Sequence, residues 1–129
     1  MATLSEVMRT EFITVAPEDT LGEVAEKMTA LTVGSVVVKD FGTLIGILTA
    51  RDLLKAMAAR VHSSEARVRQ FMTVDPVTAV PEMDCEDAEQ LMLDRGFRHL
   101  PIVEGTDVVG VVSLRRVVAA TKAAAAAAP

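Results

Sequence analysis

The sequence predicts an α+β protein with layers of helix on sheet, built from two β-α-β-β-α units that pack as a pseudo-twofold pair. Two observations predict it. A shift of 64 positions aligns residues 7–54 with 71–118 without a gap. Within each copy, runs rich in β-branched residues alternate with segments of helical periodicity. Because about 48 residues lie near the lower size limit for unaided folding, we expect the two copies to share one core.

Identical residues support the alignment, although they are few. The apolar pattern and the positions of proline and glycine also match between the copies, which makes the repeat convincing. The identical pairs are Met8 and Met72, Thr14 and Thr78, Pro17 and Pro81, Glu18 and Glu82, Met28 and Met92, Gly46 and Gly110, and Arg51 and Arg115.

The first elements of each copy are a short extended segment, at 13–15 and 77–80, and then a helix. The helices are predicted to start at capping boxes, Thr20 with Glu23 and Asp84 with Asp87, because an acceptor side chain precedes an acid by three positions. Apolar residues then recur at the spacing of one helix face. They are Leu21, Val24, Met28 and Leu31 in the first copy and Cys85, Ala88, Leu91 and Met92 in the second.

Two hairpins and two further helices complete the copies. Strong β-formers flank a Gly-containing loop at 36–48 and again at 100–112, which predicts a hairpin in each. The last helices start at Thr49 and Ser113. We divide the chain into a first repeat with a linker helix, 1–66, a second repeat, 67–120, and an Ala-rich tail, 121–129, which we expect to fray.

Composition narrows the classes of function. The net charge of −5 argues mildly against nucleic acid as a partner, and no apolar run approaches the roughly 20 residues of a membrane span. The four aromatic residues are all Phe, so the core and any ligand pocket must be walled by aliphatic groups. With Cys85 as the one cysteine and no secretory signal visible, we expect a cytoplasmic protein.

The segment Thr49 to Asp52 has two interpretations. It lies where a strand run gives way to a helix, so Thr49 and Asp52 can form a capping box that only stabilises the helix. The same geometry can bind a ligand, because a helix N-terminus attracts anions and a carboxylate accepts hydrogen bonds from ribose hydroxyls. The residues alone favour the cap by about three to one.

Three stretches of sequence resemble the CBS domain, named after cystathionine β-synthase. They are Gly42-x-Leu44-Ile45-Gly46-Ile47-Leu48-Thr49-x-x-Asp52-Leu53, Phe71-Met72-Thr73-x-Asp75-Pro76-Val77-Thr78, and Gly96-Phe97-Arg98-His99-Leu100-Pro101-Ile102-Val103. The likeness covers nearly the whole chain in two copies. It implies a tandem pair, often called a Bateman module, with clefts that bind adenine nucleotides or related ligands, and pairs that commonly form homodimers.

The resemblance reverses the preference for the cap, because it implies that Thr49 contacts phosphate and Asp52 holds ribose. It also implies a composite site in which the other copy supplies the adenine bed and the phosphate contacts. The ligand-binding residues implied in this way are Ile47, Thr49, Asp52, Asp75, Pro76, Val77, Phe97, Arg98, His99 and Arg115. AMP, ADP or ATP is the expected regulatory ligand, while S-adenosylmethionine and dinucleotides share the same adenosine half.

The second copy departs from the motif, because Arg116 stands where the first copy has Asp52. Arginine in a first helical turn opposes the helix dipole and cannot accept a bond from ribose. We therefore expect one competent nucleotide site and one degenerate site, the latter comprising Ser113, Arg116, Ile13 and Gly34.

Alternatives remain for single residues and for the function. Arg98 and Arg115 could be solvated surface charges, and His99 could be structural, whereas Cys85 fits the core better than a nucleophile's place. No spacing resembles a metal site, and no residues suggest an enzyme. The sequence thus predicts a ligand-sensing regulatory module that passes its occupancy to an unknown effector protein. The alternative is a ligand-free dimerisation or protein-interaction module.

Overall fold

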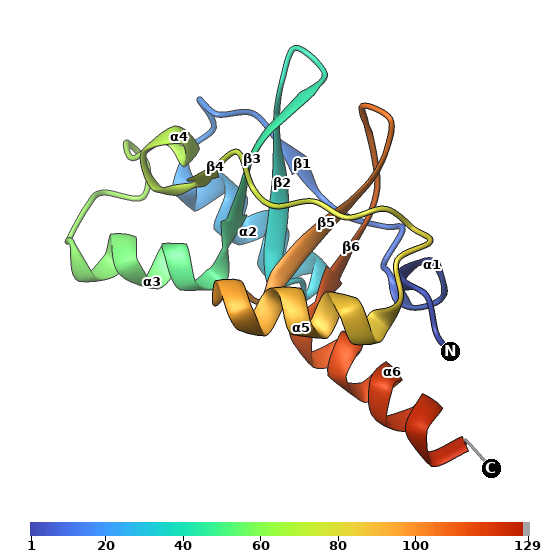
Figure 1. Ribbon diagram of the computed structural model, residues 1–129. Coiled ribbons are helices and arrows are strands. Elements are labelled where there is room, and N and C mark those ends of the chain that lie inside the picture. The colour runs from blue at the N-terminus through green and yellow to red at the C-terminus, as the bar shows by residue number, and fades with distance from the viewer. Residues whose placement is uncertain (128–129) are drawn as a thin grey trace. The chain divides into compact units, whose positions relative to one another are not determined.

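The computed structural model describes residues 1–127, which form two compact units. One unit is Phe12–Pro76, and the other joins Met1–Glu11 to the chain from Val77 onward. Figure 1 labels the elements along the chain. They are α1 (Leu4–Val7), β1 (Thr14–Val15), α2 (Leu21–Leu31), β2 (Ser35–Asp40), β3 (Thr43–Thr49), α3 (Ala50–Ala58), α4 (Val68–Phe71), β4 (Thr73–Val74), α5 (Cys85–Arg95), β5 (His99–Glu104), β6 (Asp107–Ser113) and α6 (Leu114–Ala127).

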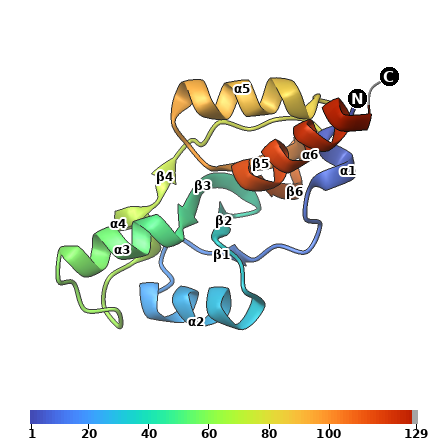
Figure 2. The same ribbon diagram turned by 90° about the horizontal axis from the view of Figure 1, so that it is seen from below.

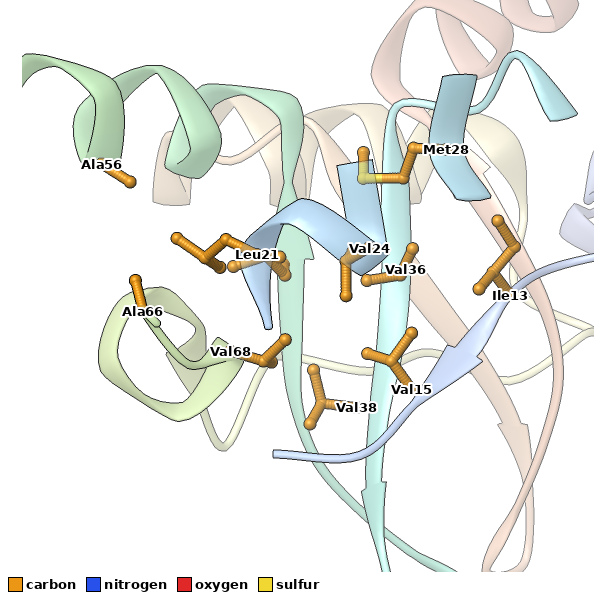
Figure 3. Close-up of a cluster of buried hydrophobic side chains, with 11 residues drawn as sticks. Ile13, Val15, Leu21, Val24, Met28, Val36, Val38, Ala56, Ala66 and Val68 are labelled. Carbon is orange, nitrogen blue, oxygen red and sulfur yellow. The ribbon is translucent and has the colours of Figure 1, made fainter. Parts of the chain in front are cut away.

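The Phe12–Pro76 unit contains a four-stranded sheet in the order β1-β2-β3-β4. The strand β1 runs parallel to β2, and β3 is antiparallel to both β2 and β4. The helix α2 covers one face of this sheet (Figure 2). Its residues Leu21, Val24 and Met28 point toward β1 and β2 in Figure 3, and they are almost completely buried. Leu31, which the pattern placed on the same face, is the last residue of the helix and is 54 % exposed.

The core of this unit is aliphatic throughout, as the shortage of aromatic residues predicts. Its buried residues are Ile13, Val15, Leu21, Val24, Met28, Val36, Val38, Leu48, Ala56, Ala66 and Val68 (Figure 3). Alternate residues of β2, such as Val37, point to the opposite face of the sheet. Of the four phenylalanines, Phe41 is fully exposed at the tip of the β2–β3 hairpin.

The other unit repeats this design with a smaller regular sheet. The strands β5 and β6 form an antiparallel hairpin, and isolated bridges extend it at Ala79 and Arg9. The extended segment expected at 77–80 therefore makes one bridge, Ala79 to Ile102, and no regular strand. The helices α5 and α6 pack together on this hairpin (Figure 1). Cys85 is buried in its core, as expected, and burial raises the pKa of its thiol, with smaller contributions from the charges of Glu6 and Asp84.

Each unit is completed by the segment that precedes the other repeat. In the Phe12–Pro76 unit, Val68 of α4 is fully buried and β4 pairs with β3. In the other unit, Leu4 of α1 is fully buried, and Arg9 pairs with Val111 of β6. The bonds match at a spacing of 64 residues, since the N–H of Val68 donates to the carbonyl of Asp19 and that of Leu4 to Met83. The sequence pattern missed α1, α4 and β4, which are too short to show a periodicity.

The predicted capping boxes form at one helix and fail at the other. At α2, the Thr20 hydroxyl accepts from the N–H of Glu23, and the carboxylate of Glu23 accepts from the N–H and hydroxyl of Thr20. These bonds hold the pKa of Glu23 below its ordinary value. At α5, Asp84 is the N-cap but makes no side-chain cap bond. A box with Asp87 would bring two carboxylates together, and their repulsion disfavours it.

The C-terminal ends of α3 and α6 differ from what the sequence predicts. The helix α3 stops at Ala58, and Arg60 adopts a left-handed conformation with φ of 60° before the linker returns. The helix α6 continues to Ala127, well into the tail that we expected to fray, because alanine has the highest helix propensity. Residues 128 and 129 lie outside the described part of the chain.

Gly46 and Gly110 allow the leading segments to approach the hairpins closely, and they generate a paired prediction. A Cβ on Gly46 would lie 2.7 Å from Sδ of Met72 and 2.9 Å from the carbonyl oxygen of Thr73. We expect Gly46→Ala to lower the free energy of unfolding by about 1–3 kcal/mol, because backbone atoms must shift. Urea denaturation measures this change.

Gly110→Ala is the matched comparison. Its Cβ would meet Sδ of Met8 at 2.6 Å, but the nearest backbone atom, the carbonyl oxygen of Arg9, is 3.1 Å away. Because a methionine side chain can rotate away, we expect a smaller loss than at Gly46. An equal loss at both glycines, or no loss at Gly46, would show that the close approach is not what constrains position 46.

Candidate functional site

The side chains of Thr49 and Asp52 form a complete capping box at the start of α3. The N–H of Asp52 donates to Oγ1 of Thr49 at 3.3 Å. In return, Oδ2 of Asp52 accepts from the N–H of Thr49 at 2.8 Å and from its hydroxyl at 3.1 Å. Both residues are half-buried, and Thr49 has the extended backbone of an N-cap. The capping interpretation of this motif is therefore confirmed.

The capping box uses only one oxygen of the Asp52 carboxylate. Every hydrogen bond that residues 1–127 make to this group goes to Oδ2. An ionised carboxylate offers lone pairs on both oxygens, so Oδ1 can accept bonds from a ligand while the box stays intact. The cap and a role in holding a diol are thus compatible in the same side chain.

The Thr49 hydroxyl has less freedom. A hydroxyl carries one proton, and Thr49 already donates it to Oδ2 of Asp52. Its oxygen also accepts from the N–H of Asp52. Thr49 can therefore donate to a phosphate only if its hydroxyl turns away from Asp52, which gives up one bond within the box.

Backbone groups around Thr49 limit the anion site further. The N–H of Ala50, in the first turn of α3, donates to the carbonyl of Gly34 at 3.0 Å. Within the described residues, the N–H of Arg51 has no such partner and is the first-turn donor open to an anion. Gly34, which we assigned to the degenerate site, thus lies against the start of α3, beside Thr49. In the alignment of the two repeats Gly34 corresponds to Arg98, whose carbonyl accepts the equivalent bond at the start of α6.

Ile47 lies in the sheet of the Phe12–Pro76 unit, and Ile13 directly precedes its first strand, β1. Ile47 is buried in β3, two residues before Thr49, and it pairs with Val37 of β2. The carbonyl of Ile13 accepts from the N–H of Val37, so both isoleucines flank that valine. Two apolar residues assigned to different sites therefore lie next to the same residue of β2.

Asp75 and Pro76 also belong to the Phe12–Pro76 unit, together with Asp52. The N–H of Asp75 donates to the carbonyl of Ile45, at the far end of β3 from Thr49. Four residues of strand separate Ile45 and Thr49, a distance of about 13 Å. Asp75 is exposed and has a φ of 48°, a left-handed conformation that aspartate tolerates better than most residues. Asp75, which follows β4, and Asp52, which lies in α3, are therefore placed at different positions along β3.

Basic residues gather at the start of α6 in the other unit. The N–H of Leu114 donates to the carbonyl of Arg98 at 2.8 Å, and Arg115 and Arg116 lie in the first turn. All three arginines are exposed, and within residues 1–127 none has a carboxylate within 4.0 Å. The N–H of Arg116 donates to Oγ of Ser113 at 3.3 Å, which keeps half of the capping bond pattern found at Thr49.

The remaining predicted residues lie in this second unit. Val77 and Phe97 are half-buried against its core, and His99 is half-buried in β5, where it pairs with Ser113 of β6. Among residues 1–127, no group of three His, Cys, Asp or Glu side chains could hold a metal ion. In the same range, no helix is long and apolar enough to span a membrane.

Comparisons with known proteins agree with this architecture. The sequence matches the CBS domain family twice, over residues 4–59 and 68–123. The chain is 36 % identical over 114 residues to a CBS domain-containing protein of Bacillus subtilis, which covers 88 % of this chain and 81 % of the relative. A crystal structure of a CBS-domain containing protein from Agrobacterium tumefaciens is 30 % identical, with a TM-score of 0.85, over 93 % of this chain and 99 % of that one.

A second similar crystal structure contains ligands. It is the CBS domain pair of protein MJ0100, crystallised with 5′-methylthioadenosine and S-adenosyl-L-methionine. It has a TM-score of 0.84 and 21 % identity, and it covers 95 % of this chain and 98 % of that one, so it shares the fold. Two family matches in tandem, on two units of the same α+β design, show that this chain belongs to the CBS domain family as a tandem pair.

Proposed function

We propose that this CBS pair, a regulatory module by family, senses an adenosine-containing ligand at Asp52 and passes its occupancy to a partner protein. AMP, ADP or ATP is the ligand we expect. The observation that carries the proposal is the Asp52 carboxylate, whose Oδ1 is not used by the helix cap. Ribose hydroxyls are donors of the kind that such an oxygen accepts. The similar CBS pair crystallised with two adenosine derivatives supports this ligand class.

The anionic part of the ligand needs donors as well. The N–H of Arg51 is open at the start of α3, and the hydroxyl of Thr49 becomes a donor if it turns. The family resemblance further predicts that Phe97, Arg98, His99 and Arg115 of the second repeat complete the site. The exposed arginines without carboxylate partners support that prediction, since a planar guanidinium matches phosphate oxygens.

A conservative variant separates ligand binding from capping. We expect Asp52→Asn to weaken binding of AMP, ADP or ATP at least tenfold, because it removes the charge and one acceptor oxygen. The melting temperature of the free protein should change little, since the amide oxygen can still accept from the N–H of Thr49. Isothermal titration calorimetry measures the affinity, with a stoichiometry near one per chain.

Glu23→Gln is the matched control, because it changes the other capping box of the same unit in the same way. It should leave nucleotide affinity unchanged. If no adenosine-containing ligand binds the native chain at millimolar concentration, or if both variants weaken binding alike, Asp52 is only a helix cap.

The second repeat offers a gain-of-function prediction. Arg116→Asp places an acid at the position equivalent to Asp52 and completes the bond pattern that Ser113 already begins. We expect it to stabilise the protein by about 0.5–2 kcal/mol, because it forms a cap and removes a cation from a helix N-terminus. Thermal denaturation measures the gain.

The same variant tests why the second site is degenerate. If the missing acid is the reason, the calorimetric stoichiometry rises from one toward two ligands per chain. A stabilised protein that still binds one ligand would show that other residues of the second repeat also prevent binding.

The alternative function, a dimerisation or protein-interaction module, is favoured by one exposed helix face. Leu54 and Met57 of α3 are 66 % and 74 % exposed, and a spacing of three places them on the same side of the helix. Large apolar side chains gathered on a surface are typical of interaction sites.

Replacing both side chains tests this alternative. If the α3 face mediates a homodimer, Leu54→Lys combined with Met57→Lys should convert dimers to monomers in analytical ultracentrifugation. At low protein concentration, where the native chain is also monomeric, the double variant and the native chain should have the same melting temperature. The exposed substitutions Arg51→Ala and Lys55→Ala serve as controls on the same helix. A double variant that sediments like the native chain would remove α3 as the dimer contact.

A further inference from the structure

A pocket of about 240 Å³ opens between the N-terminal residues, the start of α5 and the last turns of α6. Ala2, Cys85, Ala124 and Ala125 give it a largely apolar lining, and Asp84 and Glu86 add two carboxylates. Its volume is smaller than the roughly 300–1,000 Å³ of typical small-molecule sites. The pocket lies wholly in the unit that contains the second repeat, whereas Asp52 belongs to the other unit.

The equivalent place in the Phe12–Pro76 unit is filled by the chain itself. There, α3 stops at Ala58, and the linker returns across the start of α2. The carbonyl of Ser63 accepts a hydrogen bond from the N–H of Gly22 at 2.9 Å. In the second repeat, α6 continues to Ala127 instead of ending early, so within residues 1–127 no segment after α6 covers the start of α5.

The backbone bonds around the two helix starts show what the pocket lacks. The N–H of Leu21 donates to the carbonyl of Ala66, and the equivalent N–H of Cys85 donates to the carbonyl of Ala2, both at 2.9 Å. The next amide along, that of Gly22, is bonded to Ser63, but the amide of Glu86 has no hydrogen-bond partner within residues 1–127. The pocket therefore presents one backbone donor that its counterpart satisfies with a peptide carbonyl.

We propose that this pocket is a docking site for an extended peptide segment of a partner protein. The segment places short side chains against Cys85, Ala124 and Ala125 and a backbone carbonyl on the N–H of Glu86. A basic residue beside this carbonyl lies near the carboxylates of Asp84 and Glu86. The chain's own linker, with Arg60, His62 and Ser63, has this composition and is the template for the segment.

The residue at the second position of the helix differs between the units, Gly22 in α2 and Glu86 in α5, and this difference determines how closely the segment can approach. A Cβ on Gly22 would lie 3.1 Å from the carbonyl oxygen of Ser63, which is a tight contact. Glu86 carries a side chain at this position, so the carbonyl of the docked segment lies a few tenths of an ångström further out than that of Ser63. The hydrogen bond remains within reach at that distance.

The test uses the full chain and a peptide with the sequence of residues 59–65, acetylated and amidated. We expect the amide resonances of Cys85, Glu86 and Ala124 to shift and saturate during an NMR titration. Ala125→Phe, at an exposed helical position on the pocket wall, should abolish these shifts while preserving the melting temperature. Glu86→Pro removes the donor, so it should weaken binding roughly fivefold, and the melting temperature of the variant checks that a proline at the second position of α5 leaves the fold intact.

Glu86→Gln is the control for charge, because it keeps the N–H, and a scrambled peptide is the control for sequence. Absence of shifts at these amides up to millimolar peptide would overturn the proposal. So would shifts that persist unchanged in Ala125→Phe, because they would then come from another surface. The outcome is independent of nucleotide binding, since Asp52→Asn should leave the peptide titration unchanged.

Discussion

The structure depends on an exchange of leading segments between the two repeats. In one repeat alone, an edge strand of the hairpin would be unpaired and one side of the core would be exposed to solvent. About 50 residues also bury too little surface to fold unaided. The segment before the second repeat brings Val68 and β4 to the first hairpin, and the segment before the first repeat brings Leu4 to the second. The glycines at 46 and 110 allow this approach. Neither repeat can therefore be cut out along the sequence without removing part of the other unit.

The symmetry that builds the fold also shows where the copies differ. The last helix of each repeat begins with a hydroxyl that accepts from the N3 amide. Its N1 amide donates to the carbonyl of the residue just before the hairpin, Gly34 or Arg98. At N3 itself, one copy has Asp52 and the other Arg116, so a shared backbone geometry carries opposite charges. The other difference is at the helix ends. The chain turns back after α3, at Ala58, whereas α6 continues to Ala127. The proposed ligand site and the proposed peptide site each rest on one of these two differences.

Much of the fold could be predicted from the sequence, because periodicity reports on long elements. The hairpins, the buried faces of α2 and α5, and the cap at Thr49 follow from patterns of residue type. The short elements α1, α4 and β4 could not be predicted, because four residues or fewer show no period. The cap expected at Asp84 does not form because both partners are carboxylates, a combination that the rule of an acceptor followed by an acid does not exclude.

At the candidate site, the capping box of Thr49 and Asp52 could be predicted from the sequence, whereas the backbone contacts around it could not. Thr49 and Asp52 meet because they are three positions apart on one helix, which sequence spacing gives directly. The placement of Gly34 beside Ala50, and of Arg98 beside Leu114, depends on strand register and on long-range backbone bonds. Sequence spacing alone does not predict these two contacts, although the alignment of the repeats shows that they are equivalent to each other.

A crystal structure of the chain grown with AMP, ADP or ATP tests most directly whether Asp52 holds the ribose of a nucleotide. We expect density for a nucleotide with its ribose hydroxyls on Oδ1 of Asp52, with the capping box still formed and no nucleotide beside Arg116. A nucleotide bound at Arg116 with the Asp52 carboxylate left unoccupied would contradict it.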